Sequence, residues 1–179
     1  MSKENNKVLL FHSRAKDKRG KILSNFSSHA VTVEGETYPT VEHAFQAYKY
    51  MYSNNPSFSK VFTTNGNIGK AKPEHAKRAG SKGGMKKRGA VLDVLKWNAN
   101  SYQVAELLIQ AKVNQHEDVA KVVKEAREDG ILLVHFSRND MKWGAVYDHE
   151  NECIKRGENL LGNIYLQVKV DKDGGTKEV

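Results

Sequence analysis

The apolar side chains change their period near Pro39, and this change constrains the fold more than any other feature of the sequence. Before it, polar and apolar side chains alternate in residues 30–38, where Val31 and Val33 are the apolar positions before Gly35. This pattern predicts a β-hairpin with its turn at residues 34–36. After it, Thr40 is a favourable N-cap, and residues 41–53 follow the 3.6-residue period of a helix. The chain must therefore combine strands with helices.

Other segments show the same mixture. Apolar or alternating runs predict strands at residues 8–12, 131–137 and 163–170. Helices are predicted at residues 56–62, 73–80, 102–115 with Ser101 as N-cap, and 117–128 before Asp129 and Gly130. Because helices and strands do not alternate strictly, we expect an α+β fold: a single compact α-rich domain with a small sheet.

Length and composition indicate one globular domain over residues 1–179, with a core at 8–170 and a flexible tail at 171–179. No apolar run is long enough to span a bilayer and the start lacks a signal peptide, so we expect a cytoplasmic or otherwise intracellular protein with no membrane partner. The single cysteine, Cys153, and histidines without ligand spacing predict no metal site.

The net charge of +8 is concentrated in two stretches. Residues 69–89 hold one acid, Glu74, among the basic residues Lys70, Lys72, Lys77, Arg78, Lys82, Lys86, Lys87 and Arg88. A second cluster consists of Arg14, Lys16, Lys18, Arg19 and Lys21. Such blocks favour polyanions, and glycines in the first stretch let backbone amides approach an anion. The alternative for either stretch is a solvated loop.

The predicted helix at residues 41–53 carries a row of polar side chains. Glu42, Gln46 and Lys49 stand at positions i, i+4 and i+7, so an acid, an amide and an amine share one face of a mostly apolar helix. This arrangement is suited to a catalytic cleft. The alternative is an exposed face with an ordinary Glu–Lys arrangement.

Four blocks of this sequence together resemble the NADAR family in order and spacing. They are Leu23-Ser24-Asn25-Phe26, residues 38–49 (YPTVEHAFQAYK), Asp140-Met141-Lys142-Trp143-Gly144 and residues 157–162 (GENLLG). The resemblance covers roughly residues 9–170. It implies a compact α-rich domain that binds ADP-ribose-like or phosphoribosyl ligands and cleaves an N-glycosidic bond, without a cofactor.

Two activities are associated with such proteins, and the resemblance fixes the bond more closely than the substrate. One removes ADP-ribose from the amino group of guanine, and the other hydrolyses phosphoribosylaminopyrimidine intermediates of riboflavin synthesis. The two basic clusters favour the first activity, on nucleic acid, over the second. The expected partner is ADP-ribosylated nucleic acid or an ADP-ribose-like small molecule. A third possibility is a non-catalytic module that binds ADP-ribose or nucleic acid.

The chemistry of the reaction suggests roles for the charged residues. Cleavage develops positive charge at ribose C1′, which a carboxylate stabilises, and we expect Glu42 to supply it. Lys49, with its pKa lowered by burial, is the candidate amine for attack on C1′ of the ring-opened sugar. Asp140 is the second candidate acid or base, with a turn residue as the alternative.

The remaining candidates are expected to bind substrate. Trp143 beside Gly144 suits a stacking platform or, alternatively, a core anchor, whereas Trp97 is assigned to the core. The other candidates are Asn25, Phe26, Gln46, Arg78, Lys82, Asn159 and Gly162. Asn159 suits either a ribose contact or a loop-fixing role, and Arg78 and Lys82 suit a pyrophosphate.

One position departs from the family pattern: His135 stands where relatives often have a glutamate. His135 must orient substrate differently, or it is a hydrogen-bonded core histidine.

Overall fold

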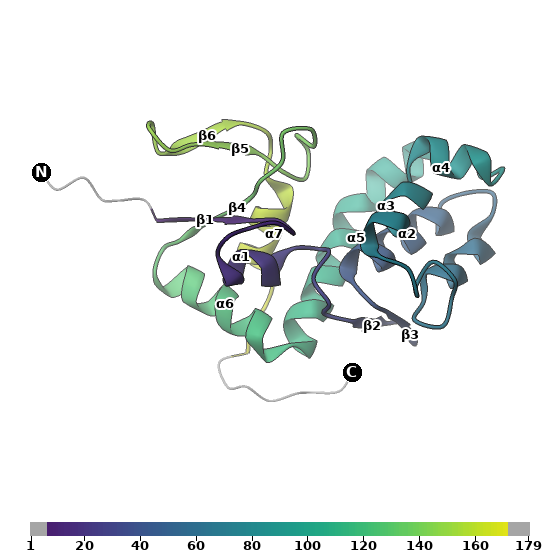
Figure 1. The fold of residues 1–179 in the computed structure, drawn as a ribbon, viewed down its shortest axis with the longest axis horizontal. Helices are drawn as coiled ribbons and strands as arrows, with labels where there is room; N and C mark the ends of the chain where they lie inside the picture. Colours follow the sequence, from purple (N-terminus) through teal and green to yellow (C-terminus); the bar gives the residue numbers. More distant parts are fainter. Residues whose placement is uncertain (1–6, 172–179) are drawn as a thin grey trace, which may run out of the picture. The chain divides into compact units, whose positions relative to one another are not determined.

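The computed structural model describes residues 7–171. The chain divides into two compact units, which are described one at a time (Figure 1). Unit 1 comprises residues 1–27 and 116–179, and unit 2 comprises residues 28–115. The expectation of one domain over residues 1–179 stays a prediction. All but residue 171 of the predicted flexible tail lies outside the described residues.

Unit 1 contains a pair of parallel strands formed by distant parts of the sequence. Strand β1 (Val8–Phe11) pairs with β4 (Leu132–His135), with Val8 opposite Leu132 and Phe11 opposite His135. An antiparallel hairpin, β5 (Val146–Asp148) and β6 (Cys153–Arg156), lies between β4 and the last helix in sequence. The parallel pair is apolar because its inward side chains are buried, notably Phe11 and Leu133.

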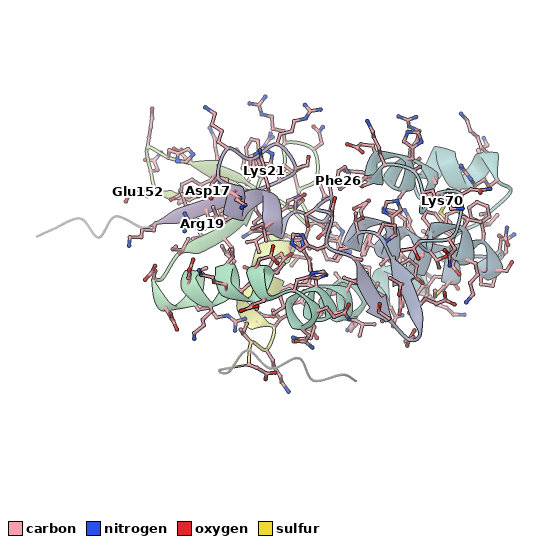
Figure 2. All side chains as sticks on the ribbon, turned by 60° about the horizontal axis from the view of Figure 1, so that its bottom comes forward. Asp17, Arg19, Lys21, Phe26, Lys70 and Glu152 are labelled. Atoms are coloured by element: carbon pink, nitrogen blue, oxygen red, sulfur yellow. The ribbon has the colours of Figure 1, made fainter. Side chains whose placement is uncertain are left out.

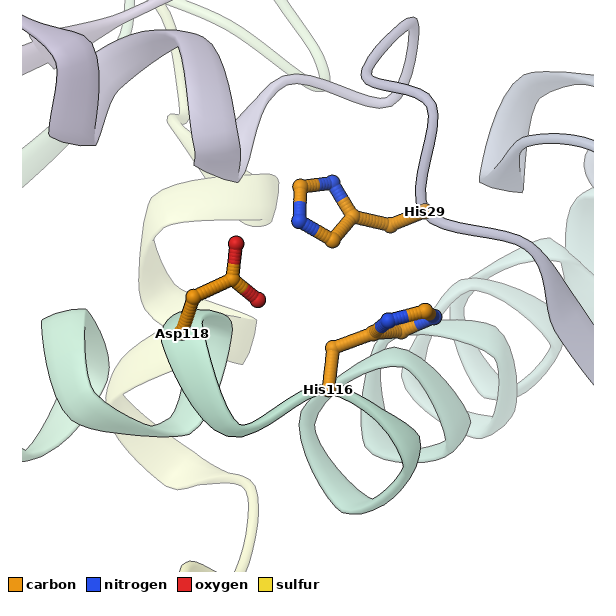
Figure 3. Close-up of side chains that lie close together, drawn as sticks. All are labelled: His29, His116 and Asp118. Carbon is orange, nitrogen blue, oxygen red and sulfur yellow. The ribbon is translucent and has the colours of Figure 1, made fainter.

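Three helices complete unit 1: α1 (Lys18–Leu23), α6 (Glu117–Glu128) and α7 (Leu160–Gln167). Helix α1 packs against β1 and α6, and α7 packs against β4 and α6. Helix α6 follows His116 and carries Asp118 in its first turn (Figure 3), where a carboxylate favours the positive end of the helix dipole. Its buried stripe is Val119, Val122, Val123 and Ala126.

Unit 2 is built around helix α2 (Val41–Met51), which follows a hairpin of β2 (Val31–Val33) and β3 (Glu36–Tyr38). A 3-10 helix η1 (Pro56–Phe62), α3 (Pro73–Ala79) and α5 (Val94–Gln115) all pack against α2. The short helix α4 (Lys82–Lys87) packs against α3. Helix α2 is therefore buried on most sides, which explains its largely apolar sequence.

The first turn of α2 is fixed by Thr40 and His43, both buried. The Thr40 side-chain oxygen accepts a hydrogen bond from the His43 backbone nitrogen, and it lies 2.8 Å from His43 Nδ1. His43 Nε2 lies 3.2 Å from the carbonyl oxygens of Ile68 and Ala71. Because a carbonyl only accepts, Nε2 carries the proton and Nδ1 accepts from the Thr40 hydroxyl. Burial lowers the pKa of His43, consistent with this neutral ring.

The mixed α and β class is confirmed, as are the hairpin at residues 31–38, the helices at residues 41–51 and 117–128, and the burial of Trp97. Two predictions were wrong. Ser101 is not an N-cap, because α5 begins at Val94 and Ser101 lies buried within it. The strand predicted at residues 163–170 is instead helix α7. Within residues 7–171, no helix combines the length and apolarity needed to cross a membrane.

Candidate functional site

In unit 2, the structure brings the polar row of α2 together as one hydrogen-bonded group. Glu42 and Gln46 are only 8% and 7% exposed, respectively. The Gln46 Nε2 atom donates to Glu42 Oε1 over 2.8 Å, which fixes one face of the carboxylate. The alternative of an ordinary exposed helix face is wrong for Glu42 and Gln46. Two polar side chains buried in a largely apolar unit indicate a site rather than a solvated surface.

Lys49 extends this row by one helical turn and reaches out of α2. Its Nζ atom donates to the carbonyl oxygen of Gly80 over 2.7 Å. Burial lowers the pKa of Lys49, and the nearby Glu42 carboxylate partly opposes this by raising it. A lysine with a lowered pKa releases its proton more readily, so this amine is suited to proton transfer or to nucleophilic attack.

The corner between α3 and α4, residues 79–81, forms the wall opposite this row. A Cβ atom added at Gly80 would come within 1.7 Å of Gln46 Oε1, so a side chain at this position would require the Gln46 amide to move. The Tyr50 hydroxyl donates to the Ala79 carbonyl over 2.9 Å and anchors the same corner. The sequence predicted Gly80 as the end of the helix at residues 73–80 and as one of the glycines that allow close backbone approach, but it did not predict the contact with Gln46.

The Oε1 atom of Gln46 is buried and has no hydrogen-bond partner among the described residues. An unsatisfied buried oxygen is costly in a folded protein. The atom packs against Gly80, where a Cβ would come within 1.7 Å of it. Gln46 therefore holds the Glu42 carboxylate with Nε2 and contacts the 79–81 corner with Oε1.

The basic stretch at residues 69–89 is not a loop, because most of its charge lies on α3 and α4. Arg78 lies in the last turn of α3 and Lys82 begins α4, and both side chains are exposed. In the second basic cluster, by contrast, Arg19 Nη2 pairs with Asp17 Oδ2 over 2.8 Å (Figure 2). Part of that cluster is thus neutralised within the chain.

In unit 1, Asp140, Trp143 and Gly144 form a turn after β4. The Asp140 Oδ1 atom accepts a hydrogen bond from the Trp143 backbone nitrogen over 3.0 Å, which is the contact of a turn residue. Trp143 is partly exposed, and Lys142 Nζ lies 5.1 Å from the centroid of its ring. The ring is therefore not a fully buried core anchor and retains an accessible surface for stacking.

Asn159 holds the following turn in place. It is 1% exposed, its Oδ1 accepts from the His135 backbone nitrogen over 2.9 Å, and its Nδ2 donates to the Leu133 carbonyl over 2.8 Å. These contacts match the loop-fixing alternative and leave ribose recognition without support. Gly162 lies within α7, where an added Cβ would meet the Leu133 carbonyl at 2.1 Å. This close approach of α7 to β4 explains the glycine by packing, whereas the sequence predicted a substrate-binding role for Gly162.

Asn25, Phe26 and His135 also belong to unit 1. Asn25 Oδ1 is buried without a hydrogen-bond partner in the described part of the chain, so it keeps its capacity to accept from a ligand. Phe26 (labelled in Figure 2) is half-buried, and its backbone nitrogen donates to Ser24 Oγ. The His135 ring stacks on Phe11 with centroids 5.3 Å apart. This contact supports the core-histidine alternative.

Comparison with known proteins gives one family. The protein-family model described as the NADAR domain matches residues 10–171 of this chain. The chain is 29% identical over 153 residues to the riboflavin biosynthesis protein PYRR, chloroplastic, of Zea mays; the match covers 82% of this chain and 22% of that protein. The chain thus spans about a fifth of the length of the maize protein.

Bacterial relatives match over most of their length. N-glycosidase YbiA of Shigella flexneri is 27% identical, with 82% of this chain and 78% of that protein covered. N-glycosidase Npun_R5314 of Nostoc punctiforme is 26% identical, with 82% of each covered. The NMR structure of YbiA from E. coli is similar with a TM-score of 0.66 at 25% identity, over 91% of this chain and 83% of that one.

Proposed function

This chain belongs to the NADAR family, and on that premise we propose that it is an N-glycoside hydrolase that removes ADP-ribose from ADP-ribosylated guanine in nucleic acid. The bacterial relatives named N-glycosidases support the general role of cleaving an N-glycosidic bond. The observation that carries the proposal is the polar row on α2, in which Glu42 and Gln46 are buried and hydrogen-bonded and Lys49 is partly buried.

Hydrolysis breaks the bond between ribose C1′ and the exocyclic nitrogen of guanine. The bonding electron pair leaves with the nitrogen, which takes up a proton, while a water oxygen bonds to C1′ and loses a proton. Positive charge builds on C1′ and the ring oxygen as the bond breaks. The Glu42 carboxylate, held by Gln46, stabilises that charge and accepts the proton of the water.

Lys49 has two roles open to it. As an ammonium group it protonates the leaving nitrogen. As a neutral amine it adds to C1′ of the ring-opened sugar, so that guanine leaves as an amine and water then hydrolyses the resulting Schiff base. Its lowered pKa supports either role, because both require the proton to be released at some stage. Asp140, in unit 1, stays a predicted second acid or base.

The net charge of +8 and the concentration of basic residues on α3 and α4 support a nucleic-acid substrate. A second candidate is the N-glycosidase reaction on a phosphoribosylaminopyrimidine of riboflavin synthesis. The name of the maize relative favours this candidate. Such a substrate needs only a small pocket that binds its phosphate and does not use an extended basic surface.

The deciding experiment compares two substrates. The protein is incubated with guanine-ADP-ribosylated single-stranded DNA and, separately, with the phosphoribosylaminopyrimidine, and the released sugar is measured by mass spectrometry. We expect release of ADP-ribose from the DNA. Release from the pyrimidine alone would establish the second candidate. Release from neither, with retained binding of ADP-ribose, would make the chain a binding module.

Two variants test the residues. Glu42→Gln and Lys49→Ala are expected to lose most turnover, on the order of a hundredfold or more, because a positioned acid–base group contributes about that much. Glu106→Gln and Lys70→Ala are matched controls, since both residues are exposed in the same unit. Borohydride during turnover distinguishes the two roles of Lys49, because only a Schiff base leaves an adduct on its peptide. Wild-type rates for both site variants would remove α2 from the mechanism.

A further inference from the structure

A groove of about 490 Å³ lies on α3, α4 and the turn before them, within unit 2. Its basic lining residues are His75, Arg78, Lys87 and Arg88, and the remaining lining residues are uncharged. We propose that this groove holds the phosphodiester backbone of a single-stranded nucleic acid next to the modified nucleotide. The inference rests on the proposed function and adds the part of the protein that makes the substrate a polymer.

The charge of the groove is not balanced by the protein. Among residues 7–171, no carboxylate pairs with the side chains of Arg78, Lys87 or His75, and all three are exposed. Glu74 on α3 is the nearby acid in sequence, and it does not line the groove. The Arg78 and Lys87 cations, which have no carboxylate partner and line a groove without an acid, suit an anionic ligand.

Arg88 is held in place before any ligand arrives. Its Nη1 atom donates to the Gly84 carbonyl over 2.9 Å, and its guanidinium lies 5.6 Å from the centroid of the Phe58 ring. A guanidinium has five N–H donors, so these contacts leave a held cation with donors for phosphate oxygens. Preorganised in this way, the side chain loses less entropy on binding than a free arginine would.

The floor of the groove is suited to an extended strand. It contains the apolar residues Ile68, Ala71 and Ala79 together with Gly84. Sugars and base faces pack on such surfaces while the surrounding cations follow the phosphates. A single pyrophosphate would use only part of this lining, whereas successive phosphodiesters use several cations at once.

The groove adjoins the catalytic candidates through one shared wall. Arg78, Ala79 and Ser81 line the groove, while the Gly80 carbonyl between them accepts from Lys49 and the Ala79 carbonyl accepts from Tyr50. A strand bound in the groove therefore lies against the same corner that faces Glu42, Gln46 and Lys49. This arrangement suits a polymer whose modified base enters the site while its neighbouring phosphates stay outside.

The test is fluorescence anisotropy with a labelled single-stranded DNA oligonucleotide that carries no ADP-ribose. Arg78→Gln with Lys87→Gln removes two groove cations. Lys70→Gln with Lys86→Gln is the matched control, because both residues are exposed in the same basic stretch without lining the groove (Lys70 is labelled in Figure 2). We expect the groove pair to weaken binding by about tenfold at low salt and to reduce the salt slope by about 0.7 for each lost phosphate contact. The control pair should have a much smaller effect.

Gly83 offers a second, independent variant. A Cβ added there meets nothing within 4 Å, so a side chain can be placed on the groove wall without disturbing the fold. Gly83→Glu should weaken DNA binding by repulsion, while Gly83→Gln, equal in length and uncharged, should bind nearly as well as wild type. Equal losses for both would show that bulk rather than charge acts there, which contradicts the proposal.

A second assay separates this inference from the proposed function. Hydrolysis of ADP-ribosylated guanosine, a substrate without a polymer, should stay near wild type in the Lys87→Gln variant, because Lys87 lines the groove and is not one of the predicted pyrophosphate ligands. Loss of that hydrolysis would place the ADP-ribose pyrophosphate in the groove and overturn the backbone role. Equal weakening of DNA binding by the groove and control pairs, or no DNA binding by wild type, would also overturn it. Failure of wild type on both substrates, with groove-dependent DNA binding intact, would contradict only the proposed function.

Discussion

The ε-amino group of Lys49 lies 2.7 Å from the carbonyl oxygen of Gly80, its acceptor across the wall of the candidate site. This contact joins α2 to the corner between α3 and α4. It places the amine in a buried setting where its charge is disfavoured, with Glu42 as the group that partly restores it. The chemistry of the site and the conformation of the corner are therefore linked.

The first prediction concerns the pKa of Lys49, which burial lowers from the ordinary 10.5. Because the Glu42 charge raises it, Glu42→Gln should lower it further. We expect labelling of Lys49 by an amine-reactive reagent, followed by peptide mass spectrometry, to reach its midpoint at a lower pH in this variant. The exposed Lys70 should be unchanged. A midpoint that moves upward or stays fixed would show that the two groups are not coupled.

The same lowered pKa predicts how stability depends on pH. Between the folded-state pKa of Lys49 and its ordinary value, the unfolded chain binds more protons at this site, so the free energy of unfolding contributed by Lys49 rises with pH. Below the folded-state pKa its contribution is destabilising. Lys49→Met should therefore flatten the pH dependence of the urea midpoint in alkaline solution, whereas Lys70→Met should not.

The second prediction concerns the glycine at the corner. Gly80→Ala should displace Gln46, because the added Cβ would meet its Oε1 at 1.7 Å, and turnover should fall while stability decreases by about 1–3 kcal/mol. Gly83→Ala is the control, since open space surrounds that position and alanine is the better helix former. In a Gln46→Ala background the Gly80→Ala substitution should cost little stability. A full cost there would mean that some other contact is responsible.

The third prediction assigns Asn159 to structure. Asn159→Ala leaves the His135 nitrogen and the Leu133 carbonyl without their partner, so we expect a loss of about 1–3 kcal/mol in unfolding free energy. Asn159→Gly tolerates the left-handed φ of 53° and should lose the same hydrogen bonds without the backbone strain. The KM of the folded variants should stay near wild type. A raised KM with unchanged stability would restore the ribose-binding role.

The fourth prediction concerns Arg127 on α6, which donates to the carbonyl oxygens of Tyr165 and Val168 at the end of α7. Arg127→Met should destabilise the protein by about 1.5–3 kcal/mol, the range for hydrogen bonds to a charged group. Lys121→Met removes an exposed cation from the same helix and should leave the urea midpoint nearly unchanged. If the two substitutions behave alike, the Arg127 contacts carry no net stability.

Local signals predicted α2 well because its N-cap and its apolar period agree. Thr40 caps the helix as its side chain predicts, and the polar row at Glu42 and Gln46 stands where the period places it. The burial of that row could not be predicted, since it depends on the chain that returns at Gly80. Only a tertiary contact distinguishes a polar stripe in a site from one in water.

The two wrong elements have specific physical causes. Helix α5 begins before Ser101 because Asp93 Oδ1 accepts from the Lys96 nitrogen, and exposed Val94 and Leu95 hide the helical period of its first turns. The segment at 163–170 alternates like a strand. However, its buried residues in α7 and just after it, Leu161, Ile164, Tyr165 and Val168, also follow a helical period. The sequence is compatible with both a strand period and a helical period, and the helix is the form that packs against β4.

The parallel register of Val8 with Leu132 sets an order on biosynthesis. As the chain leaves the ribosome, β1 emerges first but has no strand to pair with until Leu132 follows, after the whole of residues 28–115. All of unit 2 has been synthesised before Leu132, so unit 2 can fold while β1 is still unpaired. Such distant pairing raises contact order and slows the step that completes unit 1. We therefore expect the strand order to give refolding a slow final phase, in which Phe11 becomes buried.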